Sequence, residues 1–176
     1  MRTVIRGGPT TVVPPHTPAA MNLLGARWLA SANRWAGDAF RAWRSGQLAA
    51  IEVGGRFAVV RVLDQQLGIA ALRDMQAAGV VTGPVLCDDR RLAVEFLIAA
   101  RRDEPWQIRD SLLIGRSAGS FPAITVPMPG PGLPGVDGRT WLVPPTGLPP
   151  LTHPHDLASA LRRARTPRRR ARQLAR

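Results

Sequence analysis

The chain has 176 residues, which suits one domain with extensions at its ends. Its 24 basic residues are all arginine and outnumber 12 acidic ones, so the formal net charge of +12 favours polyanionic partners. The single cysteine, Cys87, excludes an intrachain disulfide and a cysteine-rich zinc site. The longest apolar stretch, 92–100, has half the length of a membrane span. Residues 1–18 do not resemble a signal peptide, so we expect a cytoplasmic protein without membrane contact.

The N-terminal part predicts a leader followed by two helices. Residues 1–20 are rich in proline, glycine and threonine and lack periodicity, which is typical of a flexible leader. Beyond them, Trp28, Trp35 and Trp43 recur on one helical stripe. We expect Gly37-Asp38 to divide this stripe into two helices, since glycine often ends a helix and aspartate often begins one. The stripe could offer nucleic-acid bases a stacking surface, but packing against a sheet is the commoner use of tryptophan and is our interpretation.

A strand pair and a helix are expected next. Residues 48–53 and 57–62 are rich in apolar side chains and flank Gly54-Gly55-Arg56, which predicts a hairpin. Residues 67–78 have helical periodicity and end before Gly79, a common helix stop. Residues 80–87 and 92–98 then predict a second hairpin.

That second hairpin turns at Asp88-Asp89-Arg90. In its second strand Leu92, Val94, Phe96 and Ile98 alternate onto one face. The alternation leaves Glu95 on the opposite face.

The C-terminal part predicts a short helix, two strands and a long helix. Pro105 is expected at the first position of a short helix that carries Trp106 and ends at Gly115. Residues 121–128 and 140–143 predict strands on either side of a surface loop. Pro154 begins the last helix, whose apolar side includes Leu157, Leu161 and Ala164 and docks on the domain.

Hairpins interleaved with helices indicate an α+β fold rather than a doubly wound parallel sheet. We expect a mostly antiparallel sheet with helices packed on one side and flexible termini. The predicted organisation is a flexible leader at 1–20, one domain at 21–164 and a basic arginine-rich tail at 165–176.

The order of these segments resembles small actinobacterial proteins related to the N-terminal domain of bifunctional DNA primase/polymerases, the prim-pol domain. The resemblance covers residues 22–165, and the match depends on the order and spacing of its pieces. These pieces are Trp28-Leu29-Ala30-Ser31-Ala32, Phe57-Ala58-Val59-Val60-Arg61-Val62, Leu67-Gly68, Gly83-Pro84-Val85, Glu95-Phe96-Leu97, Val126-Pro127 with Pro129-Gly130, and Trp141-Leu142-Val143-Pro144-Pro145.

The resemblance implies an RRM-like sheet and an ancestry in metal-dependent nucleotidyl transfer. Prim-pol domains end a hydrophobic strand with Asp-x-Asp, whose paired carboxylates hold divalent cations. This chain has Arg61-Val62-Leu63 at that place, with Asp64 one step beyond. The family's phosphate-contacting histidine also has no counterpart, because residues 81–100 contain no histidine. The resemblance implies a shared fold and ancestry, while these departures from the family's pattern predict a pseudoenzyme with no catalytic residue, no metal site and no cofactor.

The arginine-rich C-terminal segment is the strongest candidate site. Residues 162–176 contain eight arginines and no acid, which gives this segment +8 of the net +12. Eight phosphate contacts would set an upper limit of about −7 on the log–log slope of affinity against salt. The alternative is a solvated terminus, or arginine richness of genomic origin. The predicted nucleic-acid-binding residues are Arg162, Arg163, Arg165, Arg168, Arg169, Arg170 and Arg172.

Other patterns are weaker candidates. His153-x-His155 has chelating spacing but lacks a third ligand and coincides with a helix start. Residues 116–120 form a small Gly/Ser segment that could cradle a phosphate, but a connecting loop is the preferred interpretation. Cys87 is expected to be a buried structural thiol.

The sequence therefore predicts a catalytically degenerate, DNA primase/polymerase-like protein that binds nucleic acid non-specifically as an accessory factor. One alternative is an active nucleotidyl transferase that holds Mg²⁺ or Mn²⁺ through an unrecognised arrangement of acids. The other is a protein-interaction module that docks an acidic partner on the tail. The acids considered for a metal site are Asp64, Asp88, Asp89 and Glu95.

Overall fold

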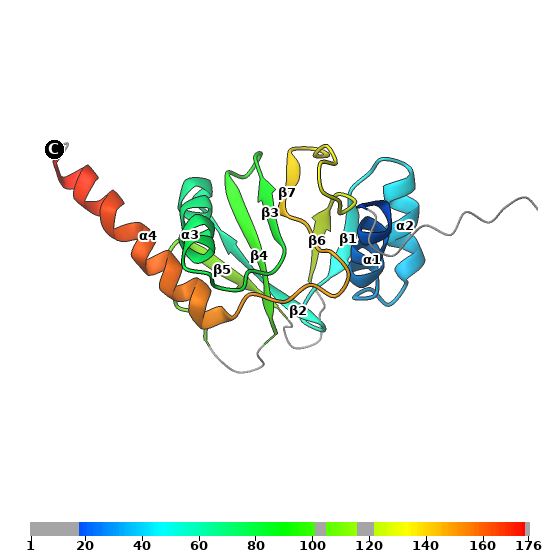
Figure 1. Cartoon of the computed structure of the whole chain (residues 1–176), viewed down its shortest axis with the longest axis horizontal. Helices are drawn as coiled ribbons and strands as arrows, with labels where there is room; N and C mark the ends of the chain where they lie inside the picture. The colour runs from blue at the N-terminus through cyan, green and yellow to red at the C-terminus, as the bar shows by residue number, and fades with distance from the viewer. Residues whose placement is uncertain (1–17, 101–104, 116–121, 175–176) are drawn as a thin grey trace, which may run out of the picture.

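The computed structural model describes residues 18–100, 105–115 and 122–174, with the side chains of those between 22 and 165 (Figure 1). In these ranges the chain interleaves helices with short strands. The helices are α1 (Pro18–Ala30), α2 (Ala36–Arg44), α3 (Gln65–Ala77) and α4 (Pro154–Leu174). The strands are β1 (Ala49–Glu52), β2 (Phe57–Val62), β3 (Val85–Asp88), β4 (Ala93–Ala99), β5 (Ser111–Ile114), β6 (Ala123–Val126) and β7 (Arg139–Val143).

Five of these strands form one antiparallel sheet in the order β5-β2-β4-β3-β7, and β1 and β6 form a separate antiparallel pair. The α+β class with a mostly antiparallel sheet is thus confirmed. The predicted hairpin of β3 and β4 is also present, with Val85 opposite Phe96 and Asp88 opposite Ala93. Its first strand begins at Val85, five residues later than the predicted start at residue 80.

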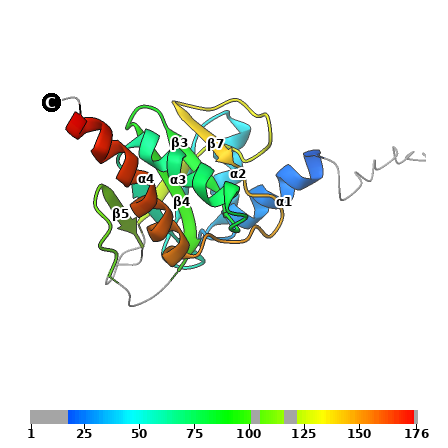
Figure 2. The ribbon, with the colours of Figure 1, turned by 60° about the vertical axis from the view of Figure 1, so that its left-hand side comes forward.

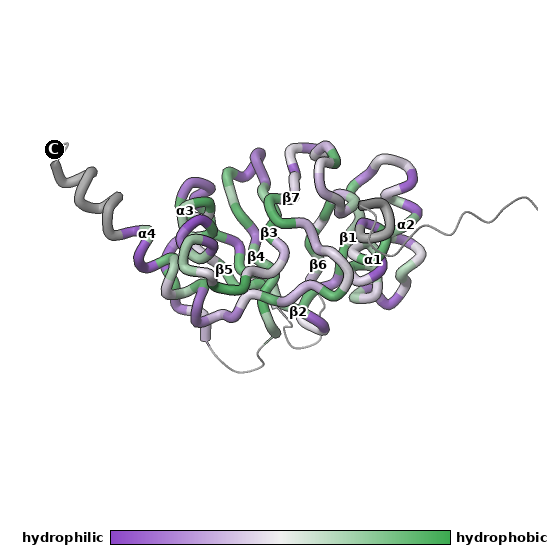
Figure 3. Tube along the Cα trace, viewed as in Figure 1, coloured by the Kyte–Doolittle hydropathy of each residue, from purple (hydrophilic) through white to green (hydrophobic). Residues whose placement is uncertain are grey.

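Helices cover both faces of the five-stranded sheet, so the prediction of helices on one side was wrong (Figures 1 and 2). On one face α3 and α4 enclose a core that includes Phe96 and Leu157. On the other face α1, α2 and the β1–β6 pair enclose a core that includes Phe57 and Leu97. The central strands explain this arrangement because neighbouring residues such as Val59 and Val60 are both fully buried. Figure 3 shows these strands as hydrophobic segments between the two helical layers.

Helix α3 agrees with the predicted helix 67–78 to within two residues at its start and one at its end. The Asp64 carboxylate accepts a hydrogen bond from the Leu67 amide at 3.0 Å, which satisfies one free donor of the first turn. Gly79 follows the helix with φ of +66°, a left-handed conformation that glycine adopts without strain. Gly68 lies where α3 crosses β4, and a Cβ there would stand 2.6 Å from the Val94 Cβ. The close approach of helix and strand therefore requires glycine at this position.

The break between the first two helices lies earlier than predicted. Helix α1 ends at Ala30, and Gly37 and Asp38 both lie inside the first turn of α2. Tertiary hydrogen bonds place the break, because the Asn33 amide donates to the Ala50 carbonyl and accepts from the Glu52 amide, each at 2.8 Å. The connection between α1 and α2 is thereby fixed to β1.

The predicted hairpin of residues 48–53 with 57–62 was wrong, although the strands themselves are present. The turn forms, with the Gly54 amide donating to the Phe57 carbonyl at 2.7 Å. Beyond it the two strands separate: β1 pairs with β6, so that Ala49 lies opposite Val126, and β2 pairs with β4 and β5. A local turn signal cannot reveal this, because each strand finds a better partner far away in the sequence.

The short helix predicted from Pro105 to Gly115 was also wrong. The chain is irregular up to Asp110 and then forms β5 at the edge of the sheet, with Leu113 opposite Val60. Ser111 stabilises the turn before β5, because its hydroxyl accepts from Trp106 Nε1 at 2.9 Å and donates to the Ile108 carbonyl at 2.8 Å. Asp110 has a φ of +54°, which does not allow a helix to continue.

The sequence predicts a protein without membrane contact. None of the helices in the described ranges is both long enough and apolar enough to cross a bilayer.

Candidate nucleic-acid interface

Helix α4 carries the predicted binding residues and is anchored by its apolar side. It begins at Pro154, which fits the first helical position because proline lacks an amide hydrogen that would go unpaired there. Leu157 and Leu161 are fully buried against the core on the α3 side of the sheet, and Ala164 packs at its edge. The predicted docking of this helix is therefore confirmed. Figure 2 shows α4 beside α3, and Figure 1 shows its C-terminal part running beyond α3.

Two of the predicted arginines bind acids of the domain. Arg163 donates to the Asp74 carboxylate of α3 through Nε and one Nη, at 3.0 and 2.7 Å. Arg165 lies 3.2 Å from the Asp110 carboxylate and also donates to the Arg109 carbonyl. These contacts attach α4 to α3 and to the turn before β5, so Arg163 and Arg165 serve the fold as well as any ligand.

The remaining predicted residues divide into two groups. Arg162 is exposed and lines a cavity at the start of α4. Arg168, Arg169, Arg170 and Arg172 follow on α4, and their side chains lie outside the described part of the chain. Helix α4 contains seven arginines and one acid, Asp156, so with its partners Asp74 and Asp110 its formal charge is +4 (7 − 3).

The cavity next to Arg162 has a volume of about 260 Å³. It lies between the first turns of α4, the ends of β4 and β5, and the irregular segment 105–108. Its walls combine apolar side chains with a few polar ones. The lining residues are Ala58, Ile98, Ala99, Pro105, Trp106, Gln107, Ile108, Leu113, Pro154, His155, Ala158 and Arg162.

A second cluster of charges is buried on the opposite face of the sheet. Glu95 accepts from Arg61 Nε at 2.7 Å through one oxygen and from Arg139 through the other. Arg139 also donates to Asp88 at 2.5 Å, and Arg91 adds a contact to Asp88 at 3.4 Å from the surface. We call Arg61, Asp88, Glu95, Arg139 and Arg91 the charge network.

Burial makes the pairing in the charge network obligatory. Glu95, Asp88 and Arg139 expose 3% of their surface or less, whereas Arg61 exposes 21% of its side chain. An unpaired charge at this depth would cost several kcal/mol, so each carboxylate must hold a guanidinium. Arg139 Nε is buried and has no hydrogen-bond partner among the described residues. Alternation along β4 predicts the face on which Glu95 lies but not these partners, which come from other strands of the sheet.

The acids considered for a metal site do not converge on an open position. Asp64 begins α3, and Asp88 and Glu95 are both bound by Arg139. Asp89 lies in the exposed turn after β3, as predicted, and accepts from Gln65 Nε2 at 2.6 Å. Within the described ranges no group of three or more His, Cys, Asp or Glu side chains could hold a metal ion.

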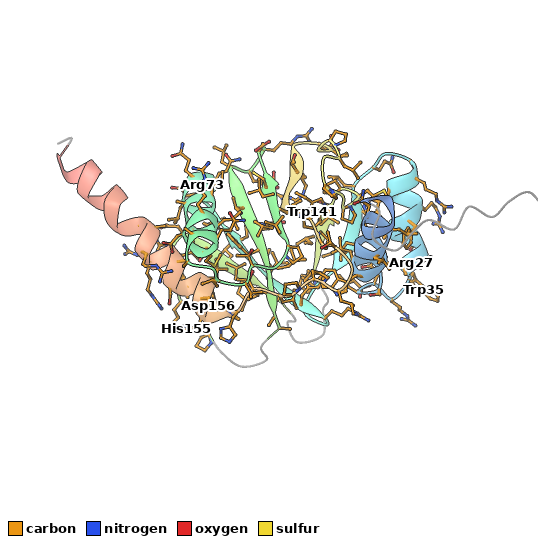
Figure 4. The ribbon with its side chains drawn as sticks, in the orientation of Figure 1. Arg27, Trp35, Arg73, Trp141, His155 and Asp156 are labelled. Carbon is orange, nitrogen blue, oxygen red and sulfur yellow. The ribbon has the colours of Figure 1, made fainter. Side chains whose placement is uncertain are left out.

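The remaining sequence candidates are dispersed. His153 and His155 are exposed at the start of α4, where Figure 4 shows His155 beside Asp156. The segment 116–120 lies outside the described residues, as do residues 1–17 of the predicted leader. Cys87 is buried on β3, and its Sγ accepts from Gln65 Nε2 at 2.9 Å. Burial raises the pKa of the Cys87 thiol, and the carboxylates of Asp89 and Asp88 add to this, while the Gln65 hydrogen bond opposes it.

The tryptophan stripe mostly serves the core, as we interpreted it. Trp28 stacks on Phe57 with ring centroids 5.4 Å apart, and buried Trp43 donates to the Val126 carbonyl at 3.1 Å. Trp35 is the exception, because it exposes 68% of its surface at the start of α2, where the Arg34 guanidinium lies 5.7 Å from its ring centroid.

Comparison of this chain with protein-family models, curated proteins and solved structures finds no match.

Proposed function

We propose that this protein binds nucleic acid non-specifically through the arginines of α4, as a catalytically inactive accessory factor that resembles the prim-pol domain. The observation that carries the proposal is the charge of +4 that remains on α4 after Asp156, Asp74 and Asp110 are counted. Guanidinium groups bind phosphates in a bidentate manner and stay charged at all physiological pH values. A helix that concentrates them attracts a polyanion before any specific contact forms.

The rigid attachment of α4 supports binding by the folded domain rather than by a detached tail. Leu157 and Leu161 anchor the first half of the helix, and Arg163 clamps it to Asp74. Arginine contacts to phosphates carry no sequence information, so the binding that we propose is non-specific. Four phosphate contacts would give a log–log salt slope of about −4.

The charge network supports the absence of nucleotidyl transfer. Metal-dependent transfer needs carboxylates that converge on divalent cations. Arg61 stands where the prim-pol resemblance expects the first of these carboxylates, and its guanidinium binds Glu95. A cation at Asp88 and Glu95 would have to displace the buried Arg139 from both.

The test is fluorescence anisotropy with a labelled DNA duplex over a series of salt concentrations. The variant changes Arg168, Arg169, Arg170 and Arg172 to glutamine and keeps Arg163 and Arg165, which attach α4. We expect a large loss of affinity at low salt and a slope that is less steep by about 3–4.

The matched control removes the same charge elsewhere. Arg27, Arg34, Arg44 and Arg56 are exposed and belong to the part of the chain around α1 and α2, across the sheet from α4. Changing these four arginines to glutamine should leave the log–log salt slope close to that of the wild type. Equal losses in the two variants would show that only net charge matters and would overturn the assignment to α4.

The two alternatives have their own outcomes. Primer extension with Mg²⁺ or Mn²⁺ that disappears in Asp88→Asn would establish the nucleotidyl transferase instead. A wild-type protein that binds no DNA or RNA, but retains an acidic protein partner through α4, would establish the interaction module.

A further inference from the structure

The cavity at the start of α4 has the size and lining for one flat ring system. Its volume of about 260 Å³ lies just below the range of about 300–1,000 Å³ that is usual for small-molecule sites. It is too small for a base together with its sugar and phosphates. Ile98, Ile108 and Ala158 give it apolar walls, which favour an aromatic occupant.

Trp106 provides an aromatic surface in this cavity. Its ring is half-buried, and Nε1 donates to the Ser111 hydroxyl at 2.9 Å, which holds the indole in one orientation. A fixed indole is a stacking partner for any nucleic-acid base, because every base presents a π-face. Gln107 and His155 also line the cavity, and their side chains can donate and accept hydrogen bonds at a base edge.

The position of the cavity relative to the charges suggests how a base reaches it. Arg162 lines the cavity, and the other predicted phosphate-binding arginines follow it along α4. The cavity is also lined by the first turn of α4, at the helix end where the dipole is positive. A strand whose phosphates lie along α4 would therefore bring a neighbouring base to the cavity.

We propose that this cavity receives one unpaired base of a single-stranded nucleic acid whose phosphates are held by α4. The inference rests on the proposed function and adds a substrate class to it. A paired base cannot leave its stack without breaking the duplex, so the cavity favours single strands over duplexes of the same length.

The test compares a labelled single-stranded oligonucleotide with its duplex in anisotropy titrations at one salt concentration. Ala158→Met fills the cavity with a side chain that helices tolerate and leaves every arginine in place. We expect the affinity for the single strand to fall about fivefold or more, given the energy of stacking one base, and the affinity for the duplex to stay unchanged.

Two further variants keep the test decisive. Gln107→Ala removes an exposed polar group from the cavity without touching the core. This variant tests the inference even if Ala158→Met fails to fold. It should weaken binding of the single strand and leave binding of the duplex unchanged. Trp35→Ala is the control, because Trp35 is exposed and lies on the α1 and α2 side of the molecule, away from His155 (Figure 4). It should change neither affinity.

Each outcome decides the inference. Unchanged single-strand affinity in both cavity variants, or an equal loss for single strand and duplex, would overturn it. A loss in Trp35→Ala that matches the loss in Ala158→Met would place the base elsewhere and would also overturn it. If cavity variants have no effect while the glutamine changes on α4 abolish binding, the base site fails and the proposed function stands. If the wild type binds neither oligonucleotide, both fail.

Discussion

Arg139 on β7 and Glu95 on β4 are bound to each other across β3, the strand that separates theirs. The contact is possible because Arg139 lies directly opposite Asp88 on β3, and its guanidinium extends over that residue to reach the next carboxylate. Arg61 approaches Glu95 from the other side, where the two residues are directly opposite on β2 and β4. The charge network thus ties four adjacent strands together on the face of the sheet that carries the core of Phe57 and Leu97.

The first prediction concerns the loss of Glu95. In Glu95→Gln Arg61 loses the carboxylate it binds in the network and the buried Arg139 keeps only Asp88, so the free energy of unfolding should fall by about 3 kcal/mol. Denaturant unfolding measures this. The control is Asp38→Asn, which breaks an exposed ion pair with Arg41 and should change stability by at most about 0.5 kcal/mol. Similar values for the two variants would contradict the role assigned to the network.

The second prediction compares two glycines. Gly68→Ala would place a Cβ 2.6 Å from the Val94 Cβ, so α3 must move away from β4 at a cost of about 1–3 kcal/mol. Gly37→Ala lies in a helix with nothing within 4 Å and should gain up to about 1 kcal/mol. In thermal unfolding, the Tm should fall for Gly68→Ala and rise for Gly37→Ala. A stabilising Gly68→Ala would mean that α3 and β4 are farther apart than described.

The third prediction is a loss of stability at alkaline pH that depends on Cys87. Burial raises the pKa of this thiol above its ordinary value of 9.0, so the folded chain keeps a proton that the unfolded chain releases. The resulting stabilisation is fully present below pH 9.0 and is lost as pH rises through the higher pKa of the folded state. The chain contains no lysine and no tyrosine, so no other side chain titrates in this window.

Chemical unfolding at a series of pH values above 9 measures this loss, and Cys87→Ala should remove the Cys87 contribution to the slope. Reaction of the native thiol with a disulfide reagent should also be slow until denaturant is added. Rapid reaction of the folded protein at neutral pH would contradict the assignment of Cys87 as a buried structural thiol.

The fourth prediction uses the contact between α3 and α4. Asp74→Asn removes the carboxylate that Arg163 binds and makes this guanidinium available to a phosphate. If α4 binds nucleic acid, affinity at low salt should rise and the log–log slope should steepen by about 0.9. Asp38→Asn releases Arg41 on α2 and provides the control, for which the slope should not change. An unchanged slope in Asp74→Asn would place Arg163 outside the interface.

Local sequence signals were sufficient to predict several elements of the fold. The bounds of β2 agree with the predicted 57–62, and the last helix begins at Pro154, because strand propensity, glycine turns and proline at a helix start act over a few residues. Asp64 was one of the acids considered for a metal site, yet it stands just before a helical pattern and caps that helix.

The failures share a physical origin in contacts between distant residues. Strand β1 pairs with β6, and Ser111–Ile114 joins the edge of the sheet through β2, so neither outcome could be read from neighbouring residues. The charge network was missed for the same reason. A signal was present, however, because Glu95 is the only charge in the strand 93–99, whose other residues are apolar on both faces. Such an acid can be accommodated only with a cationic partner, here Arg61 and Arg139.

The pairing of Ala49 with Val126 determines when the molecule can be completed during synthesis. While the ribosome is still adding residues 53–122, α1, α2 and β1 have emerged without the strand that completes their core. Formation of β1–β6 closes the largest loop in the sheet pairings, and such long-range closure slows folding. A nascent or truncated chain that stops before residue 122 would expose Ile51 and Trp43, and we expect it to require a chaperone to stay in solution.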